Sequence, residues 1–197
     1  MNRTSVILVA LALAASACSS PVQPTPTALP SPDTSTDETP ATTLDAQPVS
    51  ATGSDALFTV TVSIPSAQVT ATTAIEPVAR VGYVGPLASV DVHHGAPLVY
   101  WSIHELGGQR AMIGGVDTVC LQSTLVAGQI AKQEFAKSGG ISEDPRTGFD
   151  LAWFRQPLLR LPAGRWSISA TFDGTLGGCG GERHQVSAAV EVDVVGQ

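Results

Sequence analysis

Hydrophobic and polar residues alternate most regularly in the last third of the chain, over residues 161–195. Every second residue is apolar from Trp166 to Phe172, and the same spacing returns from Val186 to Val194. A period of two is typical of a strand with one buried face. Because a glycine-rich stretch separates the two runs, the pattern predicts a long antiparallel hairpin that closes a β-sandwich.

Shorter alternating runs, separated by proline and glycine, begin at residue 56. Residues 138–158 have the weakest periodicity, which predicts a long surface loop with residues 151–154 folded back on the core. Residues 128–137 are compatible with a short helix as well as with a strand. The chain is therefore expected to be all-β, an immunoglobulin-like antiparallel β-sandwich of about 7–9 strands over residues 56–197. The strands expected before the hairpin are 58–64, 69–75, 78–84, 87–93, 98–106, 116–125 and 129–135.

The N-terminus has a different pattern. Residues 1–17 combine a single basic residue, an apolar run from Val6 to Ala15 and small residues before Cys18. This run is too short for a stable transmembrane helix and is typical of a secretory signal peptide. With Ala15-Ser16-Ala17 before the cysteine, this end resembles a bacterial lipoprotein signal. The resemblance implies cleavage before Cys18 and a lipid anchor on it that includes palmitate, although Ala15 in place of the usual leucine leaves ordinary signal-peptidase cleavage as an alternative.

Residues 18–55 are rich in proline, threonine and serine. From residue 19 onward the stretch contains seven of the fourteen prolines and no aromatic residue, lysine or arginine. Such a composition buries too little apolar surface to offset the entropy lost on ordering. It predicts a disordered linker between the lipidated cysteine and the folded domain, with the protein exported and anchored on the extracytoplasmic side of a membrane.

Composition and charge narrow the possible functions. Loss of residues 1–17 leaves 9 basic and 17 acidic residues, a balance that argues against binding to nucleic acid or to an anionic membrane surface by charge. The sequence has no Gly-x-Ser-x-Gly, His-Glu-x-x-His or phosphate-binding glycine motif. We therefore expect a monomer without catalytic residues or cofactor, whose sandwich binds an envelope protein or polymer.

Two cysteines remain once Cys18 is assigned to lipid. In an oxidising compartment, Cys120 and Cys179 are expected to form a disulfide. The alternative is copper, because Cys179 and His184 have the C-x₄-H spacing that resembles the ligand loop of cupredoxins. A second imidazole would have to come from an earlier strand, and no methionine follows His184 as an axial ligand. The candidates for that second imidazole are His93, His94 and His104.

A family resemblance spans about 80 residues. Thr124, Leu125 and Gly128 fit a turn before a strand, and a "Pro-x-Gly-x-aromatic" motif begins a late strand. The order of these features resembles the immunoglobulin-like domain named for the intracellular proteinase inhibitor of bacilli. This resemblance implies the same sandwich and, as an alternative function, proteinase inhibition through an exposed loop such as residues 138–158. The residues of the late motif are Pro162, Gly164 and Trp166.

Two adjacent aromatic residues, Trp153 and Phe154, lie in this loop. Aromatic residues in a sandwich more often pack in the core or at its edges than bind a ligand. If both rings are exposed together, however, the loop becomes a candidate binding surface.

Overall fold

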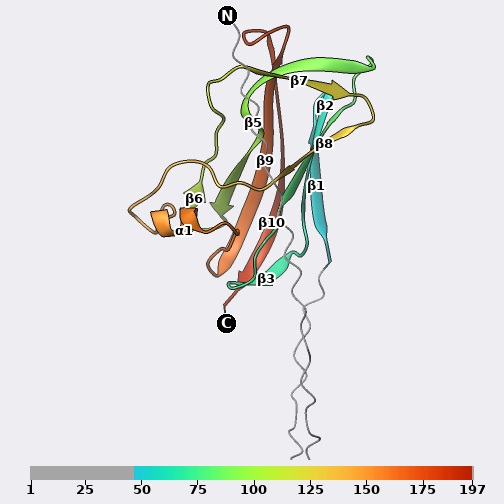
Figure 1. Cartoon of the computed structure of the whole chain (residues 1–197). Coiled ribbons are helices and arrows are strands. Elements are labelled where there is room, and N and C mark those ends of the chain that lie inside the picture. Colours follow the sequence, from blue (N-terminus) through green and yellow to red (C-terminus); the bar gives the residue numbers. More distant parts are fainter. Residues whose placement is uncertain (1–46, 197) are drawn as a thin grey trace, which may run out of the picture. The chain divides into compact units, whose positions relative to one another are not determined.

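A computed structural model describes residues 47–196 (Figure 1). Regular structure in this part of the chain consists of ten strands and one short helix, α1 (Leu151–Arg155). The strands are β1 (Val49–Ser54), β2 (Phe58–Ile64), β3 (Gln68–Thr70), β4 (Val78–Tyr83), β5 (Ser89–Glu105), β6 (Ala111–Met112), β7 (Leu121–Val126), β8 (Ile130–Glu134), β9 (Gly164–Leu176) and β10 (Glu182–Val195).

The strands form two sheets that pack face to face. One sheet has the order β1-β2-β4-β8, and the other has the order β3-β10-β9-β5-β6, with β7 paired to the first half of β5. Figure 1 shows β5, β9 and β10 in one layer and β1 and β2 in the other. The predicted all-β sandwich is confirmed, with one parallel pair, β3 with β10, in addition to the antiparallel pairs that we expected.

The predicted C-terminal hairpin is present as β9 and β10. The two strands pair without a break from Leu176 opposite Glu182 to Gly164 opposite Val194. Trp166 and Phe172, on the inward face of β9, are completely buried. The alternation in the sequence is therefore the alternation between core and solvent, and these strands supply much of the hydrophobic core.

The folded domain begins before residue 56, where we had placed its start. Strand β1 occupies residues that the composition assigns to the linker, and it pairs with β2 from Thr59 to Ile64. Its inward positions are the small or half-buried residues Val49, Ala51 and Gly53. A Cβ atom on Gly53 would collide with the backbone carbonyl of Ser187 on β10. The strand therefore packs closely without large apolar residues, which is why its sequence resembles linker.

Four expected strands differ from the structure. The strands expected over 87–93 and 98–106 are a single strand, β5, whose register with β9 shifts between His94 and Val99 around the cis Ala96–Pro97 bond. The strand expected over 69–75 is only β3, because Thr70 and Thr73 close a turn through a backbone hydrogen bond of 3.0 Å. Residues 116–120 are loop, and β7 begins at Leu121.

The alternative of a helix over residues 128–137 is wrong, because β8 lies there and pairs with β4. The loop expected over 138–158 is present except for α1, which begins after Asp150. The Asp150 carboxylate accepts the amide hydrogen of Trp153 at 2.8 Å and so caps the helix.

Candidate functional site

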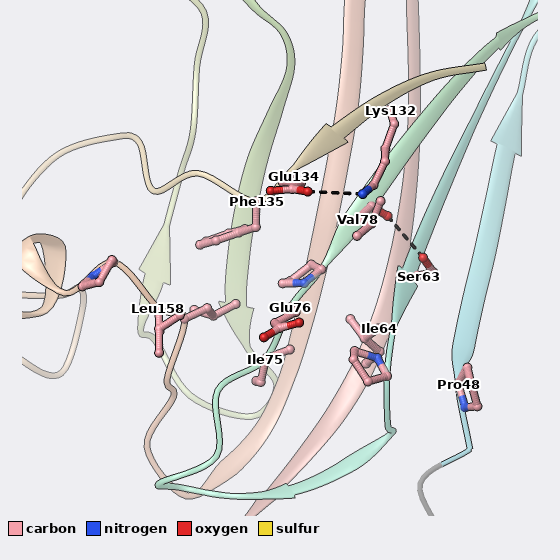
Figure 2. Close-up of a pocket in the computed structure, with 14 residues that line it drawn as sticks. Pro48, Ser63, Ile64, Ile75, Glu76, Val78, Lys132, Glu134, Phe135 and Leu158 are labelled. Atoms are coloured by element: carbon pink, nitrogen blue, oxygen red, sulfur yellow. Dashed lines mark hydrogen bonds and ion pairs between the residues drawn. The ribbon is translucent and has the colours of Figure 1, made fainter. Parts of the chain in front are cut away.

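An apolar groove lies at one end of the sandwich, where β1 and β4 begin and β2 and β8 end (Figure 2). Its volume is about 640 Å³. Ile64 and Ile75, which are 1% and 3% exposed, line its inner side. Leu158 and Phe135 also line it, and Leu158 is 43% exposed (Figure 2). The groove thus offers water-accessible apolar side chains on a rigid frame, as a binding surface requires.

Four prolines explain why several elements end at this groove. Proline has no amide hydrogen and cannot continue a ladder of backbone hydrogen bonds. Pro65 follows β2 and Pro157 follows α1, whereas Pro48 and Pro77 precede β1 and β4. An isolated β-bridge, in which Ile75 N donates to Leu159 O at 2.9 Å, connects two of these segments. We call the site the proline-rimmed groove; its prolines are Pro48, Pro65, Pro77 and Pro157.

Charged residues stand along the proline-rimmed groove. Lys132 Nζ lies 3.2 Å from Glu134 Oε1, and both side chains are largely exposed. Glu76 is exposed on the segment that leads into β4. The groove therefore presents two carboxylates and one ammonium, and the ammonium is already paired.

Strand β8, which contributes to this groove, has a free edge. It is the last strand of its sheet and pairs only with β4 among the strands described. Phe135 N donates to Pro77 O at 3.1 Å, and this bond shows which residues of β8 direct their backbone groups toward β4. In an antiparallel pair, residues alternate between bonding their neighbour and pointing away from it. The backbone groups of Ile130, Lys132 and Glu134 accordingly point away from β4.

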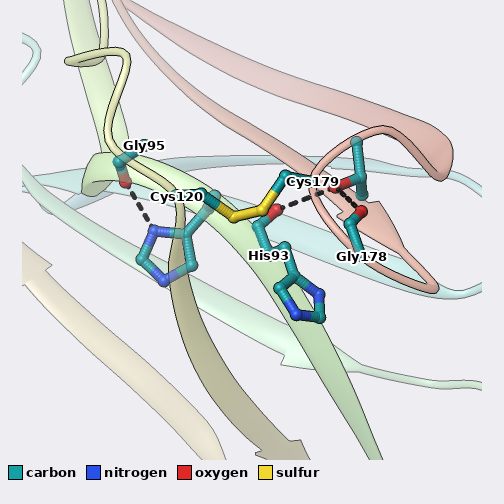
Figure 3. The surroundings of a disulfide bond; sticks show 7 residues. His93, Gly95, Cys120, Gly178 and Cys179 are labelled. Atoms are coloured by element: carbon teal, nitrogen blue, oxygen red, sulfur yellow. Dashed lines mark hydrogen bonds between the residues drawn. A yellow bond between two sulfur atoms is a disulfide. The ribbon is translucent and has the colours of Figure 1, made fainter.

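A disulfide joins Cys120 and Cys179, whose Cα atoms are 6.0 Å apart (Figure 3). It joins the loop before β7 to the glycine-rich tip of the β9–β10 hairpin. Gly177 and Gly178 have positive φ angles of 77° and 111°, which let the chain reverse there. Thr175 Oγ1 donates to Gly178 O at 2.7 Å and fixes the turn that presents Cys179.

The copper interpretation does not fit this arrangement. A blue-copper site needs a thiolate ligand, and the sulfur of Cys179 is bonded to that of Cys120. Both ring nitrogens of His94 are hydrogen-bonded, at 2.5 Å to Gly95 O and at 2.8 Å to Ser123 Oγ. No group of three or more histidine, cysteine, aspartate or glutamate side chains converges within residues 47–196 in a way that could hold a metal ion.

His184, the other proposed copper ligand, bonds to the turn between β1 and β2. Its Nδ1 lies 2.8 Å from Asp55 Oδ2, and the other carboxylate oxygen of Asp55 accepts the amide hydrogens of Leu57 and Phe58 at 2.8 and 2.7 Å. Burial raises the pKa of Asp55, but the hydrogen bond from His184 and the two amide bonds outweigh it, so the pKa lies below its ordinary value of 3.8. Asp55 thereby fastens this turn to β10.

Because the pKa of Asp55 is lower in the folded chain than in the unfolded one, its stabilising contribution is complete above about pH 5 and disappears as the pH falls through the folded pKa. We expect Asp55→Asn to lower the free energy of unfolding by about 1–2 kcal/mol near neutral pH. Asp55→Asn should also lose less stability than the wild type when the pH is lowered from about 5 to about 2.5, because it lacks the carboxylate that becomes protonated. Urea unfolding of the full chain at these pH values measures both effects. Glu143→Gln, at an exposed carboxylate, is the control, and equal acid losses in Asp55→Asn and wild type would contradict the assignment.

Trp153 and Phe154 are half-buried and do not form the exposed pair that a binding surface on this loop would need. The ring of Trp153 stacks on Phe149 with centroids 3.9 Å apart, and its indole nitrogen donates to Arg160 O at 2.8 Å. Lys137 Nζ lies 4.0 Å from the centre of the same ring. These contacts attach the loop to the domain, so the rings serve the fold.

The residues of the proline-rimmed groove were not identified from the sequence. They come from segments near residues 48, 64, 76, 134 and 158, and no local motif connects these segments. The one available signal is the repeated proline at strand ends, which we interpret from the sequence only as a mark of where strands begin and end. Cys18 lies outside the described residues.

Comparison of the chain with protein-family models, with curated proteins and with solved structures gave no match. Within residues 47–196, no helix is long and apolar enough to cross a bilayer.

Proposed function

We propose that this chain is a non-enzymatic lipoprotein of the cell envelope, exported and anchored through lipid on Cys18, whose sandwich binds a protein partner. The signal-like residues 1–17 and Cys18 support export and anchoring. The observation that supports binding is the proline-rimmed groove, in which exposed apolar side chains lie next to a free strand edge. The alternative from the family resemblance, proteinase inhibition through residues 138–158, has less support, because part of that loop is helical and its aromatic rings are packed.

Substitution of one apolar groove residue by a charged residue tests the binding site. We expect Leu158→Glu to abolish binding of the cellular partner, because a carboxylate would have to lose water when the partner covers it. Leu151→Glu is a matched control, since Leu151 is 44% exposed and lies on α1, outside the groove lining, whereas Leu158 is 43% exposed. The measurement compares the proteins that crosslink to the full chain in intact cells. Equal crosslinking of the same partner by both variants would contradict this site.

The anchor is tested separately by replacing Cys18. Intact mass should show acyl chains on the wild-type chain and none on Cys18→Ser, and only the wild type should sediment with membranes. An unmodified wild-type mass would refute the anchor and leave the groove to be judged by the crosslinking experiment.

A further inference from the structure

The free edge of β8 leads directly into the proline-rimmed groove. Lys132 and Glu134, on the last part of the strand, both line the groove, as does Phe135, which follows them (Figure 2). A segment paired along the five residues of β8 would extend about 17 Å. Its next residues would then lie against Phe135 and Leu158. One extended peptide can thus use both features.

The outer backbone groups of β8, which pair with no other strand within residues 47–196, are suited to a partner strand. The amide hydrogens and carbonyls of Ile130, Lys132 and Glu134 point away from β4, and all three residues are exposed. A partner that adds a strand satisfies such groups through its own backbone, and pockets for alternate side chains supply specificity. At the edge of β8, the proline-rimmed groove provides a pocket of this kind.

The lining defines the side chains of the partner. The buried and half-exposed apolar residues favour aliphatic or proline side chains in the groove. Glu134 is paired with Lys132, so the two carboxylates and one ammonium of the groove leave a net negative charge, which favours a basic residue on the partner and disfavours an acidic one. The excess of acidic over basic residues in the whole chain acts in the same direction, 17 against 10.

A second copy of the chain meets these requirements less well. A second copy would bring the same excess of acidic over basic residues, 17 against 10, to an edge that already carries two carboxylates, so charge favours a basic partner over another copy. Building on the proposed function, we propose that the partner is an extended segment of another exported protein, with aliphatic or proline residues next to a lysine or arginine, which adds a strand to β8 and fills the proline-rimmed groove.

Backbone pairing can be tested at one residue. Lys132→Pro removes the outward amide hydrogen but no bond to β4, and proline is tolerated on an edge strand. Lys132→Ala removes the same side chain and keeps the amide. Random peptides of about ten residues, displayed for selection on the full chain, are the probe. The strongest binder is then synthesised with and without N-methyl groups on alternate amides, which leaves its side chains unchanged.

We expect selected peptides to be rich in aliphatic and proline residues with at least one basic residue. Affinity should be at least about 10-fold lower for Lys132→Pro than for Lys132→Ala, since both variants lack the lysine side chain and only the first lacks the amide hydrogen. It should also be at least about 10-fold lower for the N-methylated peptide than for the unmodified peptide on the wild-type chain. Failure to enrich such peptides on the wild type relative to Lys132→Pro would overturn strand addition. Matching circular dichroism and unfolding midpoints for the two variants show that both are folded, and the N-methylated peptide tests pairing on the wild-type chain in any case.

The same peptides separate this inference from the proposed function. Binding that is lost in Leu158→Glu but kept in Lys132→Pro and with the N-methylated peptide would refute strand addition and leave the groove as the site. If neither Leu158→Glu, nor Lys132→Pro, nor N-methylation of the peptide weakens binding, then both strand addition and the groove as the binding site are refuted. A wild-type chain that sediments as a dimer, and as a monomer after Lys132→Pro, would show that a second copy occupies the edge and would overturn the proposed partner.

Discussion

Replacing both Cys120 and Cys179 by serine should lower the free energy of unfolding by about 4 kcal/mol. The two residues are 59 positions apart, so the disulfide closes a long loop in the unfolded chain and restricts its conformational entropy. The folded chain should keep its sandwich, because β9 and β10 pair along their full length without the bond. In addition, Asp117 N still donates to Ala96 O, at 2.8 Å in the structure, and holds part of the loop before β7.

Urea unfolding of the full chain, with Cys18 retained in all variants, measures this effect. The wild type in reductant should unfold like the double variant without reductant. Peptide mapping after alkylation should find neither Cys120 nor Cys179 modified until reductant is added. A difference in stability below about 1 kcal/mol, or alkylation of both residues without reductant, would contradict a structural disulfide. Free thiols would also revive the copper interpretation of Cys179.

The sequence was most informative where one face of a strand is buried by large side chains. The runs 166–172 and 186–194 predicted β9 and β10 with their inward faces, because core burial imposes a period of two. The pairing of Cys120 with Cys179 was predictable because the sequence has only three cysteines, and the third, Cys18, follows a segment that resembles a lipoprotein signal. In both cases the deciding constraint is visible in the residues themselves.

Strand β1 and the proline-rimmed groove could not be predicted in the same way. The inward residues of β1 are small because β10 lies directly against it, and small residues give no hydrophobic signal. The groove depends on the bridge between Ile75 and Leu159, which are 84 positions apart in the sequence. The free edge of β8 arises because β7 and β8, although adjacent in sequence, join different sheets. These are properties of tertiary packing that local patterns do not contain.

Gly53→Val is expected to have the other large effect on stability, a loss of about 3 kcal/mol in the free energy of unfolding. A side chain at this position would meet the carbonyl oxygen of Ser187, which belongs to the backbone of β10 and cannot move without disturbing its pairing with β9. We therefore expect β1 to separate from the sandwich. Amide hydrogen exchange should become faster over residues 49–54 and remain slow in β9.

Ser50→Val is the matched control, because it adds the same side chain to the same strand on the opposite, exposed face. Valine favours extended backbone, so this variant should unfold within about 0.5 kcal/mol of the wild type. Because Pro48 immediately precedes β1 and lines the proline-rimmed groove, Gly53→Val should also weaken binding of the selected peptides, whereas Ser50→Val should leave it unchanged. Equal stabilities of the two variants would show that β1 does not pack on β10 and that residues 49–54 belong to the linker, as their composition first indicated.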